Sequence, residues 1–334
     1  MKSSLIINSP YEYPLEHWKF SDSDTPPKRV DGRRSAGYLV SDPRAKKPYQ
    51  DMGVFEPIPL VNKIRQRVDK WRDAGYPGIT GVTKALLEHW QDREQRERRF
   101  FFCQIEAIET LIWLIETPAS EKTGIDIEGD GGSFRRLCSK LATGTGKTVV
   151  MAMLIAWQVI NRVTYPSDGR FSKNIFVVAP NLTVRERLSV LMPAEDKNYY
   201  DEFDVVPVSL REKLTQARVL IRNWHALQWD SEETIKKKKS VDKRGVKSDN
   251  AYARDVLGDM AKAKNIIVIN DEAHHAWRIR AGSSIKGIKA DEKKEATIWV
   301  GGLDRLHKAQ GILTCFDFSA TPFAPGSNRT TQES

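Results

Sequence analysis

The chain has 334 residues, of which 40% are hydrophobic and 29% are charged. This balance excludes a wholly disordered polypeptide, and the length is enough for about two domains with a sizeable core. The 53 lysines and arginines outnumber the 44 aspartates and glutamates, which leaves a net charge of +9. Such a surplus suits a polyanionic partner, although many proteins carry one without binding a polyanion.

The three cysteines, Cys103, Cys138 and Cys315, are too few and too far apart for a disulfide framework or a zinc site. They indicate a reducing compartment. The longest apolar stretch, residues 149–160, is too short to span a bilayer, and the apolar run near the N-terminus is too short for a signal peptide. We therefore expect a cytoplasmic protein with no membrane-spanning segment.

Residues 1–98 show little pattern beyond apolar periodicity at 61–71 and 82–90, which predicts two helices. Residues 92–99 form a dense mixed-charge run, typical of a solvated helix face or a linker. We place a domain boundary after residue 98. A smaller, mostly helical N-terminal region, suited to partner docking or to DNA contact, then precedes a domain at residues 99–334.

The pattern changes at residue 100. Apolar residues at helical spacing predict a helix over 104–115, and short β-branched runs then alternate with helical stretches. Strands that read as continuous apolar runs between helices favour a parallel sheet covered on both faces, which is an α/β domain with right-handed crossovers. The predicted strands are residues 134–141, 175–179, 219–221, 266–269 and 312–318.

Two stretches predict loops. Residues 121–132 are rich in glycine and aspartate, and residues 236–247 contain seven lysines and arginines. The basic stretch has three interpretations, namely a flexible solvated insertion, a loop that contacts phosphates, or a nuclear-localisation signal.

Residues 141–148, LATGTGKT, follow a predicted strand and open an apolar helix, which is the context that a phosphate-binding P-loop needs. Gly144 and Gly146 let the backbone N–H groups approach phosphate oxygens, and the helix that starts near Lys147 directs its positive end at the same anion. Lys147 supplies charge to the β- and γ-phosphates, and the Thr148 hydroxyl binds Mg²⁺. The predicted nucleotide-binding residues here are Thr143, Gly144, Thr145, Gly146, Lys147 and Thr148. Leu141 stands where the usual template has glycine or alanine.

An acidic pair, Asp271 and Glu272, follows the predicted strand at 266–269. Ligands of parallel α/β sheets bind at the carboxyl ends of the strands, so this pair is placed to serve the phosphate loop. Asp271 is the predicted second Mg²⁺ residue, and Glu272 is predicted to polarise the attacking water. Together with Lys147, Glu272 is our catalytic prediction. The adjacent His274 and His275 do not share a helix face and are poor joint metal ligands, so we expect one of them to relay the nucleotide state.

In their order these elements resemble the first RecA-like domain of superfamily 2 helicases and translocases. Residues 271–274 match the DEAH box of that family, and Ser319, Ala320 and Thr321 match its SAT motif. The resemblance implies a RecA-like P-loop NTPase fold with ATP and Mg²⁺ as cofactors. It also implies that His274 and the SAT residues couple ATP hydrolysis to nucleic-acid movement.

Three shorter segments add to the resemblance. Residues 177–181, with Thr183 and Arg185 following, resemble motif Ia, and residues 221–225 resemble motif Ib. Because the family places both motifs on the nucleic-acid backbone, the implied DNA-binding residues are Asn181, Thr183, Arg185 and Asn223. Residues 101–104 resemble the glutamine element, which implies that Gln104 recognises adenine. The alternative is an ordinary solvated helix glutamine.

The closer resemblance is to the motor-nuclease (Res) subunit of type III restriction enzymes. The stretch at 101–104, the bulky Leu141 before the phosphate loop and the doubled histidine carry it. It implies an ATP-dependent translocase of a restriction endonuclease, whose partners are DNA and a modification or specificity subunit.

That family motor needs a second RecA-like domain, which supplies an arginine finger, and a nuclease domain, and the 334 residues contain neither. We therefore expect a fragment, a split-gene product or a truncated relative, with the missing parts supplied in cis or in trans. The leading function is a DNA-stimulated ATPase motor. The alternative is a catalytically incomplete nucleotide- and DNA-binding fragment. A signalling or transport ATPase would share the phosphate loop but not the SAT motif or the segments that resemble motifs Ia and Ib.

Overall fold

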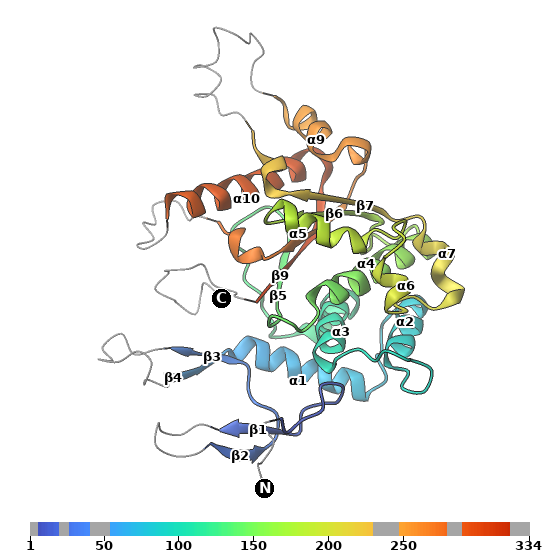
Figure 1. Ribbon diagram of the computed structural model, residues 1–334, viewed down its shortest axis with the longest axis vertical. Coiled ribbons are helices and arrows are strands. Elements are labelled where there is room, and N and C mark those ends of the chain that lie inside the picture. The colour runs from blue at the N-terminus through green and yellow to red at the C-terminus, as the bar shows by residue number, and fades with distance from the viewer. Residues whose placement is uncertain (1–5, 20–26, 41–53, 230–246, 279–288, 321–334) are drawn as a thin grey trace. The chain divides into compact units, whose positions relative to one another are not determined.

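The computed structural model describes residues 6–19, 27–40, 54–229, 247–278 and 289–320, and its chain divides into two compact units (Figure 1). Unit 1 comprises residues 1–80 and 90–127, and unit 2 comprises residues 81–89 and 128–334. The units therefore interleave in sequence. Because the two units exchange segments, they do not test the predicted domain boundary after residue 98, which stays a prediction. Within the described residues, none of the helices is long and apolar enough to cross a membrane.

Unit 1 contains two antiparallel hairpins and two long helices. Helix α1 starts at a proline and buries residues at helical spacing, Ile64, Val68 and Trp71, as its periodicity predicts. The four strands were not predicted, because each is only four residues long and shows no apolar alternation. The elements are β1 (Glu16–Lys19), β2 (Lys28–Asp31), β3 (Gly37–Val40), β4 (Val54–Pro57), α1 (Pro59–Asp73), α3 (Phe102–Glu116) and the 3₁₀ helix η1 (Ala119–Lys122).

The charged run at 92–99 follows helix α2 (Gly81–Gln91) and is irregular, so its interpretation as a helix face is wrong. Two of its arginines, Arg93 and Arg99, each form an ion pair of 2.6 Å with Glu12. The run therefore ties the N-terminal segment of unit 1 to the start of α3, where the Phe102 N–H donates to Pro10 O at 2.8 Å.

Unit 2 is built on a five-stranded parallel sheet with the strand order β5-β9-β8-β6-β7. Every strand predicted from the sequence is present. The strands are β5 (Arg136–Lys140), β6 (Asn174–Ala179), β7 (Arg218–Asn223), β8 (Ile266–Asp271) and β9 (Ile312–Ser319). This is the RecA-like α/β arrangement that the sequence predicts, and β8, which leads into the acidic pair, lies at its centre.

The helices of unit 2 include two long ones, α4 (Lys147–Thr164) and α10 (Ala290–Gln310). The shorter helices are α5 (Leu182–Arg187), α6 (Tyr199–Glu202), α7 (Arg211–Leu214) and α9 (Asp249–Leu257). Single turns of 3₁₀ helix are η2 (Leu188–Leu191), η3 (Val208–Leu210), η4 (Trp224–Leu227), η5 (Gly258–Met260) and η6 (Ala273–His275).

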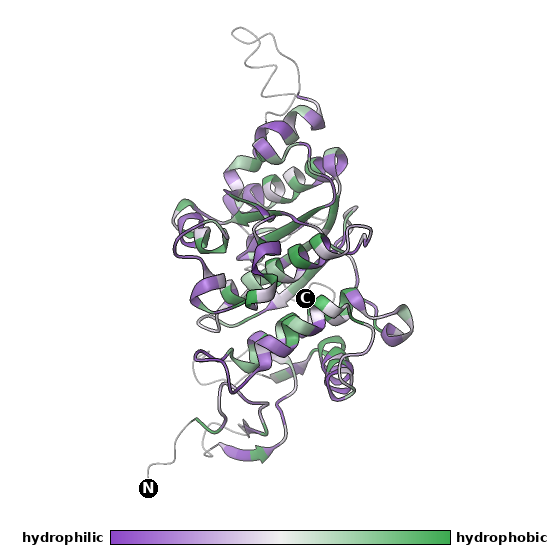
Figure 2. Cartoon of the chain, turned by 90° about the vertical axis from the view of Figure 1, so that its right-hand side faces the viewer, coloured by the Kyte–Doolittle hydropathy of each residue, from purple (hydrophilic) through white to green (hydrophobic). Residues whose placement is uncertain are grey.

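Different helices cover the two faces of the sheet. On one face, α9 and α10 form a hydrophobic cluster with alternate strand residues, Phe176, Val178, Ile266 and Val268. The residues between them are equally buried, and strand alternation directs them to the opposite face, where α4 lies (Figure 1). Figure 2 shows the strands as largely hydrophobic. Packing of helices on both faces fixes the carboxyl ends of the strands, where the predicted site residues lie.

Candidate nucleotide-binding site

The phosphate loop connects β5 to α4. The Leu141 N–H donates to Ser319 O at 3.0 Å, which joins the start of the loop to the end of β9. Inside the loop, the N–H and the hydroxyl of Thr145 donate to Ala142 O at 3.3 and 2.7 Å. The loop is therefore folded back on itself before the helix begins.

Two glycines give the loop its shape. Gly144 has φ 82°, and Gly146 has φ 78° and caps α4 at its N-terminus. L-residues with side chains rarely adopt such values, so the sequence predicts these two positions correctly as glycine-dependent turns. Helix α4 begins at Lys147, and the first N–H groups of a helix have no partner within it. A Cβ atom built on Gly144 meets no atom within 4 Å, so the loop is open on this side.

Asp271 ends β8 and is only 3% exposed. Burial raises the pKa of its carboxyl group, the neighbouring Glu272 raises it further, and Lys147 and Arg187 oppose the shift. A buried carboxylate beside a second carboxylate offers oxygen donors of the kind that Mg²⁺ prefers, and the hydroxyl of Thr148, in the first turn of α4, is a donor of the same chemistry. The residues present therefore fit the predicted metal.

Glu272 has φ 50° and ψ 47°, the left-handed conformation that is unfavourable for glutamate. Its Oε1 lies 3.5 Å from Lys147 Nζ, so the structure brings together the two predicted catalytic residues. Strained backbone of this kind is found preferentially at functional sites. The strain is independent support for a role of Glu272 in the site.

His274 connects the acidic pair to the end of β9. Its Nδ1 lies 3.0 Å from Ser319 Oγ and 3.4 Å from Glu272 Oε2. Burial lowers the pKa of His274, and so does the neighbouring His275, while Glu272 acts in the opposite direction. Of the predicted coupling residues, His274 and Ser319 are thus in contact, Ala320 is the next residue along, and Thr321 lies outside the described residues.

The predicted DNA-binding residues lie at the carboxyl ends of β6 and β7, which pair with each other. Asn181 caps α5, because its Oδ1 accepts from the Val184 N–H at 2.9 Å. Thr183 is exposed and Arg185 is half-buried in the same helix, and Asn223 is half-buried at the end of β7. Nearly all of the basic stretch, residues 236–246, lies outside the described residues.

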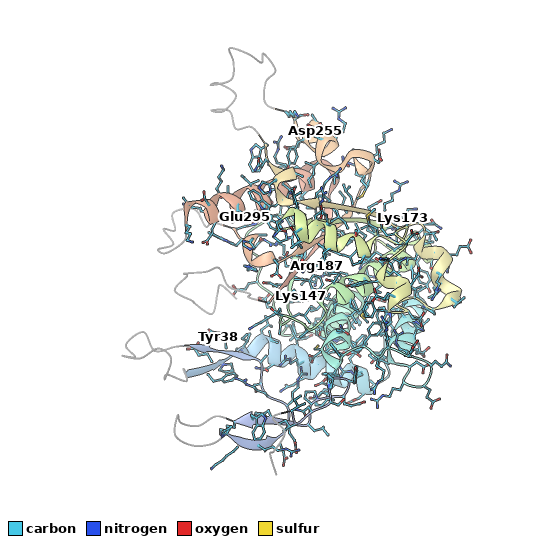
Figure 3. The ribbon with its side chains drawn as sticks, viewed as in Figure 1. Tyr38, Lys147, Lys173, Arg187, Asp255 and Glu295 are labelled. Atoms are coloured by element: carbon cyan, nitrogen blue, oxygen red, sulfur yellow. The ribbon has the colours of Figure 1, made fainter. Side chains whose placement is uncertain are left out.

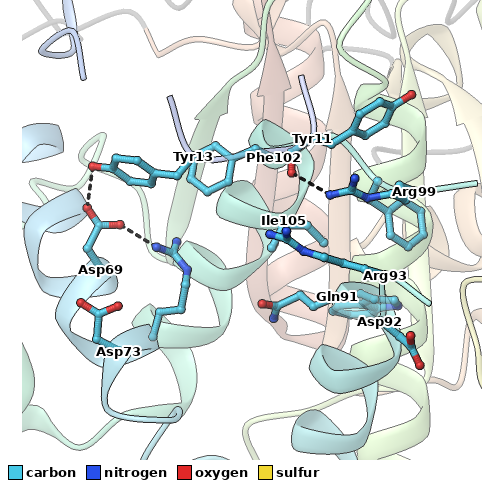
Figure 4. Close-up of a pocket in the computed structure, with 13 residues that line it drawn as sticks. Tyr11, Tyr13, Asp69, Asp73, Gln91, Asp92, Arg93, Arg99, Phe102 and Ile105 are labelled. Carbon is cyan, nitrogen blue, oxygen red and sulfur yellow. Dashed lines mark hydrogen bonds and ion pairs between the residues drawn. The ribbon is translucent and has the colours of Figure 1, made fainter. Parts of the chain in front are cut away.

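Gln104 belongs to unit 1 and is 5% exposed, so the alternative of a solvated glutamine is wrong. Its Oε1 accepts from the Phe101 N–H at 2.8 Å at the start of α3. A cavity of about 440 Å³ in the same unit is lined by aromatic and charged side chains, including Tyr11, Phe102 and Arg99 (Figure 4). Gln104 is not among the thirteen described residues that line it, so its predicted adenine role stays a prediction.

The polar residues that connect the strands leading to the site were not predicted from the sequence. Asn270 Nδ2 donates to Asp317 Oδ1 at 2.7 Å, and Asp317 forms a 2.7 Å ion pair with Arg136. Arg136 also pairs with Asp130 at 2.8 Å. These interactions join β5, β8 and β9, and Asp317 inside an otherwise apolar run was the available sequence signal. Arg187, which lies close enough to influence Asp271, gave no such signal.

A scan against protein-family models matches residues 98–324 to the family described as "type III restriction enzyme, res subunit". The chain belongs to this family. Its domain is of the superfamily 2 helicase type, which agrees with the fold of unit 2 and with the resemblance of the motifs. Membership supports ATPase and helicase-type motor activity in general. A search of curated proteins gave no match.

Proposed function

We propose that this res-subunit domain is an ATP-dependent DNA translocase motor in a type III restriction-like endonuclease, acting in the cytoplasm. The observation that carries the proposal is the meeting of Lys147, Glu272 and Asp271 at the carboxyl end of β8. The family match supports the motor activity, and the SAT contact of His274 supports coupling to movement.

In this proposal the loop from Thr143 to Thr148 binds the phosphates of ATP through backbone N–H groups and Lys147. Thr148 and Asp271 hold Mg²⁺, which when bound offsets phosphate charge. Glu272 orients and deprotonates the attacking water, and its left-handed backbone fixes its carboxylate towards Lys147. Gln104 recognises adenine.

DNA is the proposed polyanionic partner, and contacts from Asn181, Thr183, Arg185 and Asn223 would reach its backbone. Backbone contacts grip DNA without reading sequence, so target choice falls to a modification or specificity subunit. A second RecA-like lobe and a nuclease domain, in cis or in trans, complete the proposed machine.

The test is steady-state ATP hydrolysis by the full chain in the presence of Mg²⁺, with and without duplex DNA. We expect turnover that DNA increases, and we expect Glu272→Gln to bind nucleotide without hydrolysing it. Binding without turnover would support the alternative, a nucleotide- and DNA-binding module that needs a second lobe in trans. Turnover indifferent to every nucleic acid would contradict a DNA motor, and stimulation by RNA alone would change the substrate.

A further inference from the structure

One face of helix α10 carries three residues with unusual surroundings, Glu295, Trp299 and Gly302. Their spacing of four and then three residues places them on the same side of the helix. Figure 3 labels Glu295 near the N-terminal end of α10. This face packs against the turn that carries the doubled histidine, η6, and against η4, the segment that follows Asn223.

The first contact is with the acidic box, by which we mean residues 270–275, the acidic pair with Asn270 before it and the two histidines after it. Glu295 Oε2 lies 3.6 Å from His275 Nδ1, and the Glu295 side chain is 18% exposed. The fully buried Trp299 donates from Nε1 to Asn270 Oδ1 at 3.0 Å, and Asn270 directly precedes Asp271. Helix α10 therefore holds the box from both sides of the acidic pair.

The second contact involves two adjacent glycines of α10, which lie close to Leu227 at the end of η4, to Trp229 just after it and to Tyr252 of α9. A Cβ atom on Gly302 would meet Tyr252 Oη at 2.6 Å, Leu227 Cβ at 2.7 Å and Leu227 O at 2.9 Å. On Gly301 it would meet the ring tip of Trp229 at 2.6 Å. Glycine within a helix costs about 1 kcal/mol relative to alanine, so two in succession need a compensating gain, and here the gain is this contact.

The contacts continue from α10 to the proposed catalytic carboxylate. The rings of His275 and His274 lie 4.2 Å apart between centroids. His274 in turn contacts both Ser319 and Glu272. An unbroken series of contacts thus runs from Leu227 through α10, Glu295 and the two histidines to Glu272.

We propose that α10 is the element through which DNA bound at the Asn223 segment changes nucleotide binding at the acidic box, with Glu295 and Gly302 as positioning residues. The inference rests on the proposed function, because it needs both ligands to bind. A displacement of η4 by DNA passes to α10, because Gly302 lies directly against Leu227, the last residue of η4. Glu295 then moves His275, and the shift reaches His274 and Glu272.

The test measures coupling rather than activity. The affinity of the full chain for a fluorescent duplex is measured with and without a non-hydrolysable ATP analogue and Mg²⁺, and the affinity for the analogue is measured with and without the duplex. The two ratios must agree by linkage, and couplings of this kind are typically about 5- to 150-fold. We expect Glu295→Gln and Gly302→Ala to bring the ratio close to one, while each ligand alone binds within about twofold of wild type.

Two matched controls separate this role from a general structural one. Asp291→Asn removes the same charge from an exposed position on the first turn of α10. Gly301→Ala adds the same methyl group as Gly302→Ala, but it meets only the ring tip of the exposed Trp229, which is not part of η4, whereas the methyl group on Gly302 also meets the backbone of Leu227. We expect both controls to keep the wild-type ratio.

The outcomes are distinct. If wild type fails to bind either ligand, the proposed function is wrong and this inference falls with it. If both ligands bind without influencing each other, or if Glu295→Gln keeps the full ratio, the proposed function stands and α10 is not the connection. Should Gly302→Ala melt at a much lower temperature than wild type, Glu295→Gln alone decides.

Discussion

The left-handed backbone of Glu272 makes a quantitative prediction about stability. Asparagine tolerates this conformation far better than glutamate or glutamine, because its short side chain bonds locally. The conformation costs a residue with a longer side chain about 1–2 kcal/mol. Glu272→Asn should recover much of this cost, and it also removes the carboxylate that repels Asp271.

The stability lost with the Lys147–Glu272 ion pair is small. The Lys147–Glu272 pair spans 3.5 Å with Glu272 28% exposed, and pairs of this kind contribute about 0–1 kcal/mol. Glu272→Gln loses the same pair and the same repulsion but keeps the strained backbone. The difference between the two variants isolates the backbone, and we expect Glu272→Asn to be the more stable by about 1 kcal/mol.

Urea denaturation of the full chain, followed by fluorescence, measures this difference, and hydrolysis measured in parallel should be lost in both variants. The expected result is a stabilised, inactive protein, which is the signature of strain kept for function. If Glu272→Asn is no more stable than Glu272→Gln, the strain argument is refuted.

Three further predictions follow from the same site. Trp299→Phe leaves the buried Asn270 Oδ1 without its donor and should lower the free energy of unfolding by about 1–3 kcal/mol, measured with denaturant. The control Trp229→Phe changes an exposed ring and should alter stability by less than about 0.5 kcal/mol. Equal effects would contradict the assigned hydrogen bond. Burial holds the pKa of His274 below its ordinary 6.5, so between the lowered pKa and pH 6.5 the unfolded chain binds a proton that the folded chain does not. The contribution of His274 to the free energy of unfolding is therefore complete above about pH 6.5 and is lost as the pH falls through the lowered pKa. If His274→Asn leaves the stability–pH curve unchanged, the residue is not responsible. Gly144→Ala, at φ 82°, should weaken nucleotide binding and cost about 1–2 kcal/mol, and an unaltered titration would show that the loop does not need this turn.

The sheet was predictable because its strands are buried on both faces and therefore appear as apolar runs, as in residues 266–269. The phosphate loop was predictable because its glycines occupy turns that few other residues can adopt. The short hairpins of unit 1 were not, since four residues carry too little pattern.

Parts of the site depend on contacts between distant segments, which local patterns do not encode. Asn270 and Trp299 are 29 positions apart, and Asp317 and Arg136 are 181 apart. Gly302 looks like a weak point in a helix until Leu227 is seen against it. The strain at Glu272 is likewise invisible in sequence, because its residue type argues against a left-handed backbone.

We propose above that the loop at 143–148 and the acidic pair form one Mg²⁺-ATP site. A fluorescence titration of the full chain with a labelled ATP analogue in Mg²⁺ tests it most directly, with Lys147→Ala and Glu272→Gln in parallel and Lys140→Ala, an exposed lysine of β5, as control. A single Mg²⁺-ATP site predicts saturable binding by wild type, Glu272→Gln and Lys140→Ala, and loss of binding by Lys147→Ala. Equal affinity of Lys147→Ala and wild type would contradict it.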